Sequence, residues 1–109
     1  MEYLVANEAT LKQKKKMRVK IKNRDILLTS TENGIFAIQD KCPHRGVSLA
    51  SGKLEDGVIS CKDHGLPISV ETGEVTDMKK AEFLKLDEFS LSVRTFKTIV
   101  KDGKVFVEM

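Results

Sequence analysis

The sequence reads Cys42-Pro43-His44-Arg45-Gly46 in one place and Cys61-Lys62-Asp63-His64-Gly65 in another. These two segments contain both cysteines and both histidines of the 109-residue chain. Each segment holds one thiol and one imidazole close together, so a tight turn can present both side chains to one site. Two buried cysteines and two incidental histidines would not be expected to pair twice in this way. The pattern predicts that one metal centre is bound by Cys42, His44, Cys61 and His64.

The ligand types narrow the kind of metal centre. Thiolates suit zinc and iron-sulfur clusters, whereas imidazoles suit zinc, copper and iron. The usual zinc-finger order places two cysteines before two histidines, but each segment here carries one of each. In a binuclear cluster with two cysteine and two histidine ligands, the cysteines bind one iron and the histidines bind the other. Each segment can then supply one ligand to each iron, and zinc remains the alternative.

The segments around the two motifs have the pattern of short antiparallel strands. Apolar or alternating runs predict strands at residues 3–6, 16–22, 26–29, 35–38, 58–59, 68–70, 95–100 and 105–107. Turn residues separate them, at Asn23-Arg24-Asp25, Glu32-Asn33-Gly34, Asp56-Gly57, Glu71-Thr72-Gly73-Glu74 and Asp102-Gly103. Residues 76–94 follow neither a clean helical nor a clean strand period, so the sequence supports no prediction of secondary structure there. The chain is therefore expected to be mainly antiparallel β.

Length and composition limit the kinds of protein that this chain can be. With 109 residues it is expected to form a single domain over residues 1–109, because this length supports one hydrophobic core of ordinary size. Its 40% hydrophobic and 32% charged residues are typical of a soluble globular protein. No apolar run approaches the roughly 20 residues that span a bilayer, and the first residues lack a secretory-signal pattern. We expect a cytoplasmic protein that makes no membrane contact.

The charge distribution has one uneven region. The net charge of +3 is small and does not indicate nucleic-acid binding. Basic residues nevertheless gather near the N-terminus, at positions 12, 14, 15, 16, 18, 20, 22 and 24. From residue 16 onward they alternate with apolar residues at period two, which is typical of the solvated face of a half-buried strand. A docking patch for an acidic partner is the other interpretation.

The two motifs, with sixteen residues between His44 and Cys61, resemble the two ligand boxes of Rieske iron-sulfur proteins. The resemblance continues at residues 34–40 before the first box, at residues 72–74 after the second, and at residues 102–105. It implies one [2Fe-2S] cluster held by Cys42, His44, Cys61 and His64. It also implies an all-β fold, an antiparallel β-sandwich of three small sheets with a two-loop cluster-binding subdomain at about residues 40–75.

Some positions differ from the pattern that is common in this family. High-potential respiratory members carry a further cysteine in each box, and the two are joined as a disulfide, whereas here Val47 follows Gly46 and no third cysteine exists. The chain thus resembles the soluble ferredoxin branch, and its midpoint potential is expected in the lower third of the range of about −150 to +300 mV. Lys62-Asp63 and Ile68 stand where many relatives have proline and aromatic residues, and residues 76–94 lack a proline-rich covering loop. Shielding of the cluster must be supplied differently or be absent.

The resemblance implies electron transfer rather than catalysis. Protein ligands fill the iron coordination, so no position is open for a substrate. We expect a ferredoxin, not itself an enzyme, that passes single electrons from a flavin reductase to an oxygenase. The alternative is the small Rieske subunit of a multisubunit reductase such as assimilatory nitrite reductase, with the large subunit as its partner. A zinc-bound interaction module is the third possibility.

Overall fold

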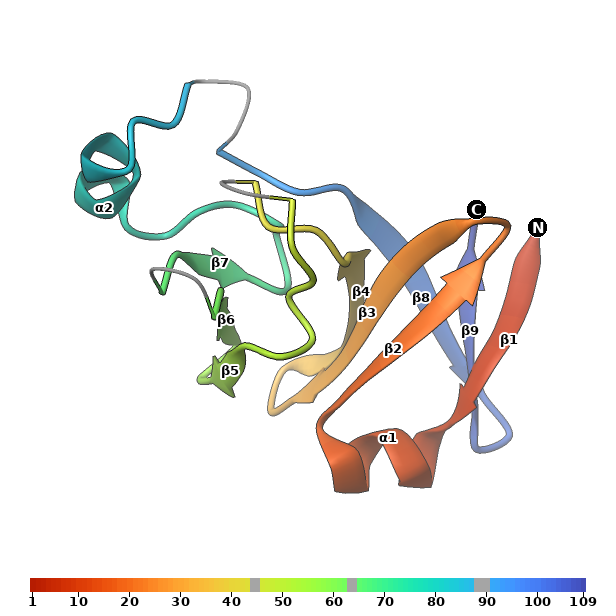
Figure 1. Cartoon of the computed structure of the whole chain (residues 1–109). Coiled ribbons are helices and arrows are strands. Elements are labelled where there is room, and N and C mark those ends of the chain that lie inside the picture. Colours follow the sequence, from red (N-terminus) through yellow and green to blue (C-terminus); the bar gives the residue numbers. More distant parts are fainter. Residues whose placement is uncertain (44–45, 63–64, 88–90) are drawn as a thin grey trace.

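The computed structural model describes residues 1–43, 46–62, 65–87 and 91–109, and its strands form two antiparallel sheets (Figure 1). Sequence order gives β1 (Glu2–Asn7), α1 (Glu8–Lys14), β2 (Lys16–Ile21), β3 (Arg24–Thr31), β4 (Gly34–Gln39), β5 (Lys53–Glu55), β6 (Val58–Ser60), β7 (Pro67–Ser69), α2 (Met78–Phe83), β8 (Thr95–Lys101) and β9 (Lys104–Glu108). The predicted all-β class is confirmed. No helix of the described residues is long and apolar enough to cross a membrane.

The larger sheet has six strands in the order β1-β9-β8-β4-β3-β2, and the smaller sheet has three in the order β5-β6-β7. Strand β8 belongs to both halves of the larger sheet. Its first two residues, Thr95 and Phe96, pair with β4, and residues 97–101 pair with β9. Two of the three expected small sheets are therefore continuous through β8.

Two-residue turns close three of the hairpins. In the turns Lys22-Asn23, Asp56-Gly57 and Asp102-Gly103, both residues have a positive φ, between 46° and 77°. This is the conformation of type I′ turns, whose twist matches that of the flanking strands. The predicted turns at residues 56–57 and 102–103 are confirmed. The first turn begins one residue earlier than predicted, because Arg24 already pairs with Ile21 as the first residue of β3.

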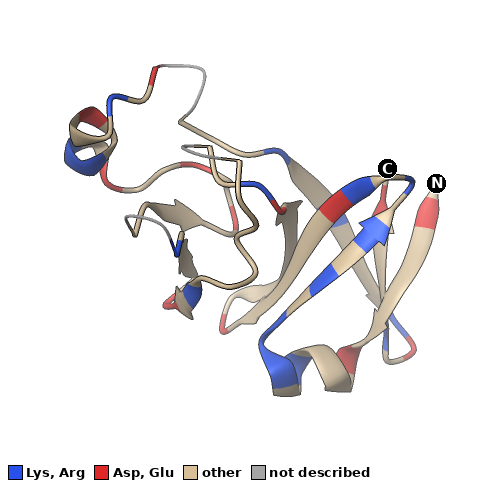
Figure 2. Cartoon of the chain, in the orientation of Figure 1, with Lys and Arg blue, Asp and Glu red and all other residues tan. Residues whose placement is uncertain are grey.

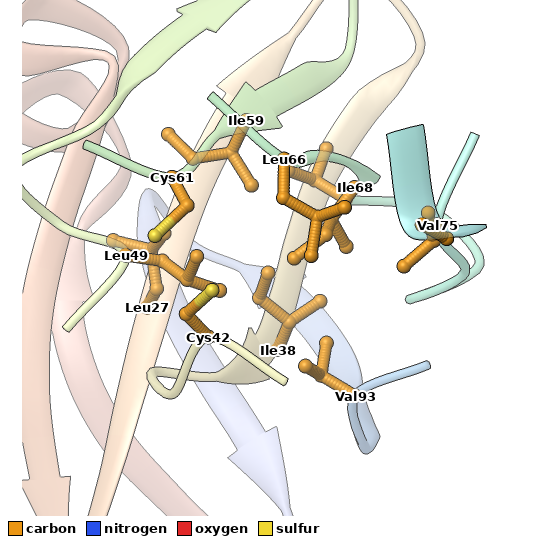
Figure 3. Packing of buried hydrophobic residues seen from close by; sticks show 12 residues of the cluster. Leu27, Ile38, Cys42, Leu49, Ile59, Cys61, Leu66, Ile68, Val75 and Val93 are labelled. Atoms are coloured by element: carbon orange, nitrogen blue, oxygen red, sulfur yellow. The ribbon is translucent and has the colours of Figure 1, made fainter. Parts of the chain in front are cut away.

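Strands β3 and β4 separate two hydrophobic clusters. The first, which we call the sandwich core, consists of Leu11, Ile21, Ile26, Leu28, Ala37, Val105 and Val107. The second, the loop core, consists of Leu27, Ile38, Cys42, Leu49, Ile59, Cys61, Leu66, Ile68, Val70, Val75, Ala81 and Val93 (Figure 3). Neighbouring side chains of β3 point to opposite clusters, so this strand is buried on both faces. Its uninterrupted apolar run, Ile26-Leu27-Leu28, follows from that position.

Helix α1 lies in a region for which the sequence predicts no element. It places Leu11, which is fully buried, in the sandwich core. An ion pair of 3.1 Å joins Lys12 Nζ to Glu8 Oε2 one helical turn away. Because the helix has seven residues and Leu11 is its one buried residue, its sequence contains no apolar period from which it could be recognised.

Residues 76–87 and 91–94 pack against the loop core. Helix α2 begins after Asp77, whose Oδ1 accepts a hydrogen bond of 3.0 Å from the N–H of Lys80. Residues 91–93 then return beside residues 73–75, since the N–H of Val75 donates to Leu91 O and the N–H of Val93 donates to Gly73 O. The partly buried side chains that cover the loop core here are Leu84, Leu86 and Leu91. These residues therefore cover the loop core, although the sequence from 76 to 94 contains no proline.

Candidate metal centre

The two predicted ligand motifs lie in two loops that the fold brings to one core. We call residues 42–47 the box-one loop and residues 61–66 the box-two loop. Cys42 and Cys61 begin these loops, have exposed fractions of 0% and 2%, and both belong to the loop core (Figure 3). The structure thus brings the two predicted thiolate ligands into one core. His44 and His64 lie outside the described residues, so their ligation stays a prediction.

The box-one loop is closed by two backbone hydrogen bonds to Cys42. The N–H of Cys42 donates to the carbonyl oxygen of Val47 at 2.7 Å. The N–H of Gly46 donates back to the carbonyl oxygen of Cys42, also at 2.7 Å. Gly46 has φ +73°, a conformation that glycine adopts without strain. These bonds hold the loop as a tight turn with the cysteine at its start.

The box-two loop repeats this pattern at the equivalent positions. The N–H of Cys61 donates to Leu66 O at 2.9 Å, and the N–H of Gly65 donates to Cys61 O at 2.9 Å. Gly65 has φ +65°. The two loops therefore have the same pattern of backbone hydrogen bonds, although their sequences differ between the cysteine and the glycine. Two equivalent turns that each present a thiol to one core fit the donor set of a cluster with two cysteine ligands on one iron.

The box-one loop begins two residues after Asp40, a side chain that the sequence analysis did not single out. Its carboxylate is buried and closes the base of the loop. Oδ1 accepts from the N–H groups of Leu49 and Ala50, at 2.7 and 3.0 Å, and Oδ2 accepts from Ser48 Oγ at 2.6 Å. Residues 48–50 are thereby fixed to the end of β4. The available signal was an acidic residue two positions before Cys42, at the end of the resembling segment 34–40.

The box-two loop is closed at its base by sheet pairing. Ser60, the last residue of β6, pairs with Pro67, the first residue of β7. The carbonyl oxygen of Pro67 also accepts a hydrogen bond of 3.0 Å from the N–H of Thr76. Helix α2 lies close by, because Lys80 Nζ is 3.2 Å from the position that a Cβ on Gly65 would take. Among the described residues no group of three or more His, Cys, Asp and Glu side chains is placed to hold a metal ion.

Comparison with known sequences identifies the family. The profile of the Rieske [2Fe-2S] domain matches residues 1–97. The chain is 41% identical over 80 residues to the oxygenase subunit of 3-chlorobenzoate-3,4-dioxygenase from Comamonas testosteroni, covering 71% of this chain and 18% of that protein. It is 32% identical over 84 residues to the ferredoxin component of the alkene monooxygenase system from Xanthobacter autotrophicus, covering 76% of this chain. The chain spans 61% of that second relative.

Solved structures agree with the fold. The ferredoxin of carbazole 1,9a-dioxygenase from Nocardioides aromaticivorans IC177 superposes with a TM-score of 0.80 at 20% identity, covering 98% of this chain and 96% of that one. The terminal oxygenase of carbazole 1,9a-dioxygenase from Novosphingobium sp. KA1 gives a TM-score of 0.83 at 24% identity, covering 97% of this chain and 29% of that one. The profile match over residues 1–97 shows that the chain belongs to the Rieske [2Fe-2S] domain family, whose domain carries one [2Fe-2S] cluster.

Proposed function

We propose that Cys42, His44, Cys61 and His64 hold the [2Fe-2S] cluster and that the protein is a ferredoxin that supplies single electrons to an oxygenase. The observation that carries the ligand set is the pair of equivalent turns, each of which begins with a cysteine buried in the loop core. In the sequence, the two histidines follow these cysteines by two and three residues and precede Gly46 and Gly65. When bound, the cluster supplies a centre that accepts and releases one electron.

The two loops are buried at their cysteines and exposed farther along, and this arrangement supports electron exchange with a docked protein. Both cysteines are buried, whereas Val47 and Lys62, farther along the same loops, are exposed. A cluster held between the cysteines and the outer parts of these loops is protected on its inner side by the loop core. Its outer side faces the part of the surface where the loops are exposed, so a partner can approach there.

The names of the relatives support a partner of the oxygenase class. Two of them are ferredoxin components, of the alkene monooxygenase system and of 3-phenylpropionate/cinnamic acid dioxygenase. One solved structure is a complex of oxygenase and ferredoxin in carbazole 1,9a-dioxygenase. A second candidate function is that of a Rieske domain within an oxygenase, because the relative with 41% identity is named an oxygenase subunit. The proposal also includes three further points: the chain forms a single domain, it is located in the cytoplasm, and its electron donor is a flavin reductase.

The cluster is tested on the purified full chain. Metal and sulfide analysis is expected to give about two irons and two sulfides per chain, as a [2Fe-2S] centre requires. Dithionite reduction is expected to give the EPR spectrum of a histidine-ligated cluster. Protein-film voltammetry is expected to place the midpoint potential in the lower third of about −150 to +300 mV. A colourless protein with stoichiometric zinc would contradict the ligand proposal, and a clearly positive potential would contradict the ferredoxin branch.

The carrier role is tested separately by size exclusion of the native protein from cell extract. A free carrier is expected to elute at the size of the single chain. When the reduced protein is mixed with an oxygenase, its cluster is expected to become oxidised. Elution with a large partner would instead indicate a fixed subunit.

A further inference from the structure

The basic residues of β2 do not all act as a solvated strand face. Strand β2 is at the edge of the six-stranded sheet, and Figure 2 shows Lys and Arg spaced along it. Lys16, Arg18 and Lys20 alternate with the apolar residues of this strand. Two of the three reach across to residues 40–52, which carry the box-one loop. Arg18 and Lys16 are therefore linked to the candidate metal centre through these residues.

Arg18 holds the carboxylate that closes the base of the box-one loop. Its Nε is 2.9 Å from Asp40 Oδ2, and its Nη2 is 3.1 Å from Asp25 Oδ2. The Asp40 side chain is 0% exposed, whereas that of Arg18 is 52% exposed. A buried carboxylate requires a charged or hydrogen-bonding partner for each oxygen, and a guanidinium can bind two carboxylates at once. Arg18 thereby fixes the orientation in which Asp40 accepts from residues 48–50.

Lys16 reaches the far end of the same segment. We call residues 48–52 the bridging segment, because it leads from the base of the box-one loop to the smaller sheet. The side-chain Nζ of Lys16 donates to the carbonyl oxygen of Gly52, and the N–H of Gly52 donates to Leu49 O at 2.9 Å. Both ends of the bridging segment are thus tied to cations of β2, one end through Asp40 and the other directly.

The bridging segment also contacts the strand that leads into the box-two loop. A Cβ on Gly52 would overlap the carbonyl oxygen of Ser60, so the two backbones touch at this point. Ser60 directly precedes Cys61. The bridging segment therefore contacts residues that directly precede or lead into each loop: Asp40, two residues before Cys42, and Ser60, one residue before Cys61.

We propose that Arg18 and Lys16 are positioning residues for the iron-sulfur centre, because through the bridging segment they fix the Cys42 loop relative to the Cys61 loop. The inference rests on the proposed ligation by these two cysteines. Neither a solvated strand face nor a docking patch requires such contacts. The cations act on the cluster through geometry, by holding the backbone from which the two thiolates extend.

The neighbouring cation provides a matched control. Lys20 lies two residues after Arg18 on the same strand, and its carboxylate contact is with Asp25, at 3.9 Å. Replacing Arg18, Lys16 or Lys20 by methionine removes the same charge from the same strand and keeps a long side chain. A polar pocket of about 260 Å³ borders Arg18 and Asp40, so water can occupy part of the space left by the guanidinium. The R18M variant is therefore expected to fold.

The experiment compares R18M, K16M and K20M with the wild type as cluster-loaded full chains. Three measurements are made: the EPR spectrum after reduction, the rate of cluster loss in the presence of an iron chelator, and the thermal unfolding curve. R18M and K16M are expected to shift or broaden the EPR lines. R18M is expected to lose the cluster roughly ten times faster, the effect of a lost hydrogen bond to a charged group. K20M is expected to match the wild type, and R18K to recover part of the R18M change, because one ammonium cannot replace the fork of the guanidinium.

The outcomes separate this inference from the ligand proposal. A wild type that lacks the Rieske EPR spectrum refutes the ligand proposal itself. A normal wild type, with R18M and K16M giving the EPR spectrum and cluster-loss rate of K20M, overturns the positioning role. A lowered unfolding temperature with an unchanged EPR spectrum overturns it as well, because stabilisation alone does not change the cluster geometry. If R18M does not fold, R18K and K16M decide between these outcomes by the same measurements.

Discussion

The box-one and box-two loops have the same internal hydrogen bonds, but they are fastened to the protein in different ways. In each, the cysteine N–H and the glycine N–H close one tight turn. The base of the box-one loop depends on a side chain, the Asp40 carboxylate, whereas the base of the box-two loop is the backbone pairing of β6 with β7. Replacing this one side chain is therefore enough to release the base of the box-one loop. The second can be disturbed mainly through the backbone next to it.

The largest effect should be the same for both loops. Cys42→Ala and Cys61→Ala each remove a thiolate that nothing in the other loop replaces, so each variant is expected to lose the [2Fe-2S] cluster completely. Iron content and the EPR signal of the purified variants provide the measurement. Val47→Ala, in the exposed part of the box-one loop, serves as the control and is expected to keep the cluster. Full iron content in either cysteine variant would show that this cysteine is not a ligand.

Removing the Asp40 carboxylate should separate the two loops. Asp40→Ala leaves the N–H groups of Leu49 and Ala50 without their acceptor, and the free energy of unfolding is expected to fall by about 3 kcal/mol. Denaturant unfolding of the loaded protein measures this. Asp25→Ala is the control, because the Asp25 side chain is 37% exposed and its loss is expected to cost less than about 1 kcal/mol. Equal losses in the two variants would mean that the buried carboxylate does not fasten the loop.

A change at Gly52, in the bridging segment, should disturb the box-two loop through Ser60. The added Cβ of Gly52→Ala meets the backbone carbonyl of Ser60, and the overpacking is expected to cost about 2 kcal/mol of stability. Gly57→Ala is the comparison, since nothing lies within 4 Å of its added Cβ and the cost is that of its positive φ, about 1 kcal/mol. Thermal unfolding and the EPR spectrum are measured together. An altered EPR spectrum is expected for the Gly52 variant, and an unaltered one would count against the contact.

The smallest effect is expected at the cation beside the box-two loop. Lys80 Nζ lies near Gly65, but this loop is closed by backbone pairing, so Lys80→Ala is expected to change stability by less than about 0.5 kcal/mol. Its EPR spectrum and cluster-loss rate should equal those of the wild type. A loss as large as that of the Arg18 variant would show that both loops depend on side-chain cations.

Local patterns predicted most of the strands, and they predicted that the two cysteines lie at one site. Asp-Gly at residues 56–57 and 102–103 predicted turns correctly, because type I′ geometry restricts the sequence strongly. Strand β5 was not predicted, since it has three residues and one apolar side chain, Leu54. Helix α2 was not predicted either, because Ala81 is its one buried residue. Short elements contain too few residues to establish a period.

The contacts that fasten the candidate site were not predictable in the same way. Asp40 and Arg18 are visible in the sequence as charged residues, but the burial of Asp40 and its pairing with Arg18 depend on strands that are not consecutive in the sequence. A period-two pattern gives Arg18 and Lys20 the same role, whereas the structure separates them by what lies across from each. The ligand chemistry was local and could be predicted, while the support of the ligands depends on tertiary contacts.

The burial of β3 on both faces has a consequence for native-state hydrogen exchange. Its side chains enter the sandwich core on one face and the loop core on the other. The amides at the buried centre of β3, residues 26–29, are expected to exchange with solvent only when both clusters open, and thus to be protected up to about the global free energy of unfolding. Amides of α1, which contributes Leu11 to the sandwich core, can exchange through a local opening. Such protection of β3 would show that the two cores unfold as a single cooperative unit, in which destabilising one core also lowers the protection of the other.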